Sequence, residues 1–147
     1  IVVFIIFRNF VPSMAVIISA FADIFMTIVV VNLLGIEISG AGIVALLMLI
    51  GYSVDTDILL TNRTLRRHEG SVNDRIWSSF KTGITMTLTA IASVTVSLLI
   101  VRTLSITLNQ IFTILLIGLF FDLVNTWITN VSIIKWYVLH KEGGHKK

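Results

Sequence analysis

The sequence predicts an all-α fold, a polytopic bundle of about five membrane-spanning helices of which the first is partial. Of its 147 residues, 56% are hydrophobic and 13% are charged, whereas soluble domains average roughly 45–50% and about 25%. The mean hydropathy is +0.97. The apolar residues form runs close to the ~20 residues that cross a bilayer. This pattern is typical of an integral membrane protein.

The rest of the composition excludes several kinds of site. There is no cysteine, so neither a disulfide nor a thiolate metal centre can form. The net charge is +3, but the basic residues lie beside the apolar runs and form no separate patch, so we expect no nucleic-acid partner. No Gly-rich phosphate loop ending in Lys-Ser/Thr is present. We therefore expect no nucleotide, metal or other cofactor.

The first apolar segment, IVVFIIF, stops at Arg8, far short of a full span. It does not resemble a signal peptide, because no basic region precedes it and no small-residue cleavage site follows. We interpret residues 1–8 as the end of a longer helix.

Four fuller spans are expected at residues 12–34, 41–62, 82–101 and 111–139. Pro12 suits the first turn of its helix. Residues 35–40 form a short polar turn, residues 63–81 a basic loop, and residues 102–110 a second turn. Residues 1–140 thus form one transmembrane domain, followed by a polar tail at residues 141–147.

The basic loop contains a pattern of its own. Ser71 followed by Asp74 predicts a capping box at a helix start. Val72, Ile76 and Phe80 then recur at every fourth position, which suggests a short amphipathic helix on the membrane surface, with Trp77 among the headgroups.

The charges of the loops indicate the orientation. When the spans alternate, ten basic residues fall on one side and only Arg102 falls on the other. The ten are Arg8, Arg63, Arg66, Arg67, Arg75, Lys81, Lys135, Lys141, Lys146 and Lys147. By the positive-inside rule, loop 63–81 and the C-terminus are cytoplasmic, in a multi-pass protein of the cell membrane.

Four carboxylates lie inside the expected spans: Asp23, Asp55, Asp57 and Asp122. A lone charge at mid-bilayer costs about 2.5–3.5 kcal/mol on insertion scales, so each needs a partner, a proton or water. One interpretation is that they brace the bundle as buried, hydrogen-bonded groups. The other is that they take up and release protons, since burial favours the neutral carboxyl and a nearby cation favours the ionised one.

Asp55 and Asp57 are about 200° apart around a helix and cannot share a face. One of them therefore enters the bundle interior, while the other lies next to a basic side chain or at a water-filled opening of the bundle. Alternatively, Gly51 and Ser53 break the helix locally so that both point inward.

Two polar stripes accompany these acids. On the span 82–101, hydroxyls recur three or four positions apart at Thr82, Thr85, Thr89, Ser93 and Ser97, with Lys81 at the cytoplasmic end. Such hydroxyls serve most often as contacts between membrane helices, and otherwise line a wetted path. On the last span, Gly118, Asp122, Asn125, Thr126 and Thr129 fall on one face. An acid and an amide on one stripe favour a function beyond helix contact.

The stretch IGYSVDTDILLTNRTLRR resembles the signature span of the SecF family, which acts with SecD in protein export and belongs to the RND superfamily. SAFADIFMTIVVVNLLGIE resembles the preceding SecF span and SSFKTGITMTLTAIAS the following one. The resemblance covers essentially the whole chain, and the Asp55-Thr56-Asp57 form resembles archaeal members.

The resemblance implies a six-helix membrane half that pairs with the matching half of SecD, and an extracytoplasmic domain between its first two helices. It also implies a non-enzymatic accessory role at the Sec channel, where the proton-motive force helps to pull the translocating preprotein across the membrane. In the family, protons move along acidic and basic residues near the SecD–SecF interface. Membrane lipid is the remaining expected contact.

The family's functional residues carry over position by position. SecD and RND-type proteins have an aspartate aligned with Asp55, which is the first candidate for the essential acid, and Asp57 is the second. Bacterial SecF has Asn-Asp-Thr at residues 55–57 and a functional arginine aligned with Lys81. Asp23 matches an aspartate of the family, and Asp122 has no bacterial counterpart. The expected supporting polar residues are Tyr52, Thr82, Thr85, Thr89, Ser93, Asn125 and Thr126.

Two other functions remain compatible with the sequence. A proton-coupled RND transporter half for lipids or small molecules shares the Gly-x-x-Val-Asp pattern. An intramembrane aspartyl protease needs two facing aspartates, for which Asp55 and Asp122 are the candidates, but its Gly-x-Gly-Asp motif is replaced here by Gly51-Tyr-Ser-Val-Asp55.

Overall fold

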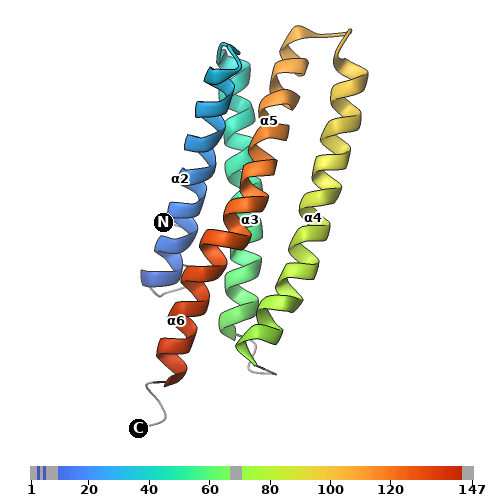
Figure 1. Cartoon of the computed structure of the whole chain (residues 1–147). Helices are drawn as coiled ribbons and strands as arrows, with labels where there is room; N and C mark the ends of the chain where they lie inside the picture. The colour runs from blue at the N-terminus through green and yellow to red at the C-terminus, as the bar shows by residue number, and fades with distance from the viewer. Residues whose placement is uncertain (1–2, 4, 6–9, 67–70, 144–147) are drawn as a thin grey trace.

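The computed structural model describes residues 3, 5, 10–66 and 71–143, and within them the chain is an all-helical bundle (Figure 1). Four helical segments are long and apolar enough to cross a membrane. They are α2 (Phe10–Leu33), α3 (Gly40–Arg66), α4 (Val72–Val101) and a last segment made of α5 (Ile106–Asn125), η1 (Thr126–Asn130) and α6 (Val131–Gly143). The predicted fold class is confirmed, with four spans in the described part; the predicted partial helix at residues 1–8 lies almost entirely outside it.

The helices run up and down, and α5 packs against α2, α3 and α4 (Figure 1). The C-terminal end of α3 and the start of α4 lie at the same end of the bundle as the C-terminal end of α6, while the α2–α3 and α4–α5 turns lie at the other. Small clusters of apolar side chains fill the contacts, for example Leu49, Val94, Leu115 and Leu119 between α3, α4 and α5.

The turn after α2 shows why residues 35–40 interrupt the apolar pattern. Gly35 adopts a φ of 68°, which a residue with a Cβ rarely adopts. Its N–H donates to the Asn32 carbonyl (3.0 Å) and the Ile36 N–H to the Val31 carbonyl (3.1 Å), which is a Schellman motif. The Gln110 side chain contacts the Ser39 hydroxyl and the Glu37 carbonyl, so this turn is tied to the start of α5.

The structure corrects the predicted surface helix. The capping box is present, since the Ser71 hydroxyl accepts from the Asp74 N–H and the Asp74 carboxylate accepts from the Ser71 N–H. The helix that begins there runs on without a break to Val101. Val72 and Ile76 pack against Ala15, Ile134 and Val138, so the apolar stripe that suggested a membrane-surface position contacts α2 and α6 instead.

Gly83 allows a close approach between α4 and the last span. A Cβ at this position would lie 2.5 Å from the Trp127 ring, which is rigid and already packed edge-on against Phe80. We therefore expect Gly83→Val to destabilise the protein by about 1–3 kcal/mol, the usual cost of overpacking a core. Thermal unfolding of the purified protein in detergent measures the effect. Gly51→Val is the matched control, since it makes the same change where nothing lies within 4 Å of the Cβ position, and equal melting temperatures for both variants would contradict the packing argument.

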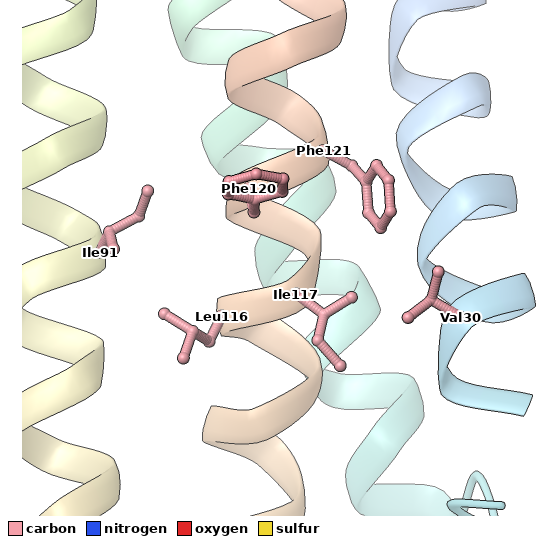
Figure 2. Close-up of a pocket in the computed structure, with 6 residues that line it drawn as sticks. All are labelled: Val30, Ile91, Leu116, Ile117, Phe120 and Phe121. Atoms are coloured by element: carbon pink, nitrogen blue, oxygen red, sulfur yellow. The ribbon is translucent and has the colours of Figure 1, made fainter. Parts of the chain in front are cut away.

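An apolar hollow lies outside the polar part of the bundle. It holds about 350 Å³ and is lined by Val30, Ile91, Leu116, Ile117, Phe120 and Phe121, which come from α2, α4 and α5 (Figure 2). All six side chains are hydrocarbon, so the hollow contains no group that binds or transfers an ion. A functional site has to be sought among the buried polar residues.

Candidate functional site: a buried acid cluster

Three of the four aspartates turn inward, and each comes from a different helix. Asp23 on α2, Asp57 on α3 and Asp122 on α5 are at most 1% exposed. Asp122 lies close enough to Asp23 and to Asp57 for a charge on either to act on its carboxyl group. We call these three residues the acid cluster. Burying a carboxylate is costly unless donors, a proton or a cation compensate, so the partners of each group matter.

Asp23 is supplied with donors by two neighbouring helices. The Ser53 hydroxyl of α3 donates to Asp23 Oδ2 (2.6 Å), and the Asn125 amide of α5 donates to Asp23 Oδ1 (3.0 Å). The same amide nitrogen lies 2.9 Å from the Ser19 carbonyl of α2. Both oxygens of Asp23 are therefore satisfied by neutral groups, and the three helices are joined at this point.

Asp57 and Asp122 are linked through one hydroxyl. Thr126 Oγ1 lies 3.0 Å from Asp57 Oδ1 and 3.3 Å from Asp122 Oδ1. Asp57 Oδ1 also accepts from the Asn130 amide at 2.6 Å. Because a threonine hydroxyl has one proton to donate, it serves only one of the two carboxylates at a time.

The π-helical turn η1 determines that both Thr126 and Asn130 face Asp57. In an α-helix four residues turn slightly more than a full circle, so Asp122, Thr126 and Asn130 would drift steadily around the axis. The wider turn between Thr126 and Asn130 reverses that drift, and Asn130 is fully buried against Asp57 while Thr129 is exposed. The α-helical period predicted Thr129 on this face and missed Asn130, and that prediction is wrong for this reason. Single π turns recur at functional sites.

Asp55 lies on the other side of its helix. α3 is continuous from Gly40 to Arg66, so of the two alternatives the one in which Gly51 and Ser53 break the helix is wrong. Of the two acids, Asp57 is the one that enters the interior, while Asp55 is exposed on the outer face of α3. Since Asp122 is fully buried, Asp55 and Asp122 do not form the facing pair that an aspartyl protease requires.

Lys81 and most of the α4 hydroxyls also lie outside the acid cluster. Lys81 is exposed, and its Nζ lies 5.6 Å from the Trp77 ring centroid. The exposed hydroxyls of Thr85, Thr89 and Ser93 each donate to the carbonyl four residues earlier (2.7, 2.7 and 2.8 Å). Together with Tyr52, Met86 and Ala90 they line a shallow groove between α3 and α4. Thr82 accepts a hydrogen bond from Arg63 (2.7 Å).

Most of the predicted residues thus fall into two groups. The acid cluster gathers Asp23, Asp57 and Asp122 with Asn125 and Thr126. The α4 groove gathers Tyr52, Thr85, Thr89 and Ser93, while Asp55 and Lys81 are exposed and do not line it. Ser53 and Asn130, which complete the acid cluster, were not among the predicted site residues. The signal for Ser53 was its position four residues before Asp57, on the same helix face.

Known proteins are similar to this chain over nearly its whole length. Residues 1–140 match the family model described as "Protein export membrane protein SecD/SecF, C-terminal". The chain belongs to the SecD/SecF family. The resemblance to SecF noted in the sequence is confirmed by its relatives, and no solved structure matches the chain.

The relatives are archaeal proteins named protein-export membrane protein SecF. The chain is 47% identical to that of Methanolacinia petrolearia over 145 residues, 98% of this chain and 50% of the relative. It is 48% identical to that of Methanocaldococcus jannaschii over 141 residues, 94% of this chain and 50% of the relative. For Pyrococcus furiosus the identity is 48% over 143 residues, 97% and 48% of the two chains. The chain spans about half the length of the relatives it matches.

Proposed function

We propose that the protein containing this chain is a SecF subunit that acts with SecD at the Sec channel and uses the proton-motive force to promote protein export. It is an accessory subunit and not an enzyme. The family match and the names of the relatives support the export function. In this proposal the loop at residues 63–81 and the C-terminus are cytoplasmic, as the distribution of basic residues indicates.

One observation carries the coupling part of the proposal: three aspartates from three spans meet in the interior and are held by neutral hydroxyl and amide donors. An ionisable group buried among membrane helices marks an ion pathway by default. A carboxylate that is held only by neutral donors can bind a proton without first breaking an ion pair. The acid cluster is therefore where we place proton uptake and release.

The α4 groove is the surface on which we place SecD. α4 is the least buried of the four spans: 11% of the residues in its most apolar stretch are buried, against 33–39% in the other three. Hydroxyls at Thr85, Thr89 and Ser93 suit contacts with another membrane helix. Asp55 and Lys81 are exposed as well, and their charges are available to an interface with SecD. Translocating preprotein and membrane lipid complete the set of partners.

The proposal is tested by export into inverted membrane vesicles that carry the full-length complex with SecD. We expect the Asp55→Asn/Asp57→Asn double variant to export at the rate that the wild type shows after an ionophore collapses the proton gradient. The export rate measured after the ionophore should be the same in both and is the control for assembly. Full gradient stimulation in the double variant would refute coupling through these acids.

A further inference from the structure

The two sides of α4 differ in the size of their residues. The side that lines the α4 groove carries Thr85, Thr89, Ala90 and Ser93, which are small enough to let another helix backbone approach closely. Ile91 is two residues from both Thr89 and Ser93, so it faces away from them and into the apolar hollow of Figure 2. A partner helix therefore suits one side of α4, and the hollow on the other side needs a different occupant.

The hollow suits a hydrocarbon chain better than a helix. Its six lining side chains are valine, leucine, isoleucine and phenylalanine, and none of them is small. Helices in membranes meet closely where small residues let their backbones approach, and large side chains keep the backbones apart. A lipid chain is thin and flexible, so it can fill the space of about 350 Å³ between these side chains.

A basic residue lies on the same side of α4, toward the α4–α5 turn. Ile91, Thr95, Leu98 and Arg102 are three or four residues apart, and the backbone is still helical at Arg102 (φ −52°, ψ −36°), so the four share one face. At a rise of 1.5 Å per residue, Arg102 lies about 16 Å from Ile91 along the axis. Its side chain is exposed. In the expected topology Arg102 is also the one basic residue at this end of the bundle, so its charge is not explained by the orientation of the spans.

α5 adds a polar side chain near the same end. Asn109 lies seven residues before Leu116, which lines the hollow, and therefore on the same face of α5 about 10 Å nearer the turn. The next residue, Gln110, is already engaged by the α2–α3 turn. The hydrocarbon of one leaflet is about 15 Å deep, close to the separation of Ile91 and Arg102. A lipid chain in the hollow would therefore bring its headgroup to Arg102 and Asn109.

We propose that the hollow between α2, α4 and α5 binds one hydrocarbon chain of a phospholipid, and that Arg102, assisted by Asn109, binds its phosphate. The guanidinium group presents parallel N–H donors that match two phosphate oxygens at once. Basic side chains beside gaps between membrane helices are a recurring way of binding lipid headgroups. This inference goes beyond the proposed function, because the lipid binds whether or not export is driven by protons.

Titration of phosphatidylglycerol into the delipidated full-length complex with SecD, followed by native mass spectrometry, tests the proposal. We expect Arg102→Gln to weaken the tightest bound lipid about tenfold or more, the usual effect of losing a hydrogen bond to a charged group, and Arg102→Lys to retain most of the affinity. Ile91→Trp fills the hollow and should weaken binding as well. Ile18→Trp is its matched control, since Ile18 is 49% exposed on α2 and does not line the hollow, and it should bind as the wild type does.

Three results would overturn the proposal. The first is equal lipid affinity in the wild type and Arg102→Gln, which decides the matter even if Ile91→Trp fails to assemble. The second is displacement of the lipid by excess inorganic phosphate, which would show that Arg102 binds the ion and the hollow contributes nothing. The third comes from a benzophenone amino acid placed at Phe120 and illuminated in native membranes. It should attach to lipid, and attachment to another polypeptide segment would show that a helix occupies the hollow.

Discussion

Asp57→Asn alone should remove nearly all of the gradient-dependent stimulation of export, while Asp55→Asn should leave most of it. The asparagine keeps the volume of the side chain and an oxygen that accepts from Thr126 and Asn130, so the fold is preserved. It has no proton to release at physiological pH. Loss of one proton-transfer group costs roughly a hundredfold in other systems, enough to bring export to its gradient-free rate.

The measurement is the export rate with and without an ionophore, in vesicles that contain equal amounts of complex. Asp55→Asn makes the same chemical change one helix face away and is therefore the matched control. If Asp55→Asn abolished stimulation and Asp57→Asn preserved it, the proton path would run along the exposed face of α3, through the groove beside α4, and not through the acid cluster.

Asn125→Leu should destabilise the bundle by about 1–3 kcal/mol, because it leaves a buried acceptor without its donor. The Asn125 amide donates to Asp23 Oδ1 and to the Ser19 carbonyl, so both α2 groups lose a partner when the amide is removed. Leucine has a similar volume, so the loss is one of hydrogen bonding and not of packing. Thermal unfolding in detergent measures it, with Asn62→Leu on the exposed face of α3 as the control.

A double-mutant cycle separates hydrogen bonding from other causes. If the amide acts mainly on the carboxylate, Asp23→Leu combined with Asn125→Leu should cost less than the sum of the two single changes, because no unpaired carboxylate remains. Additive effects would show that Asn125 stabilises the bundle independently of Asp23. A melting temperature of Asn125→Leu equal to that of Asn62→Leu would contradict the prediction outright.

Much of the site could be predicted because its signal lies along single helices. An aspartate inside an apolar run is conspicuous, so Asp23, Asp57 and Asp122 were all identified as candidates. The capping box at Ser71 was also correct, since its two residues are neighbours in the chain. Predictions from residue spacing were wrong where a helix departs from 3.6 residues per turn. The π turn brings Asn130 to the face where Thr129 was expected, and the α-helical period gives no sign of such a turn.

The sequence by itself determined that this chain crosses the membrane as helices, and it predicted which side its basic residues occupy. It also showed that Asp55 and Asp57 cannot share a face of an unbroken helix. These properties follow from hydropathy, charge and the fixed angle between residues of one helix. Only the tertiary structure decided that Asp57 faces inward, that Thr126 joins it to Asp122, and that α4 runs unbroken through the predicted surface helix. Periodicity describes the faces of one helix, but which face meets which neighbour depends on how all the helices pack together.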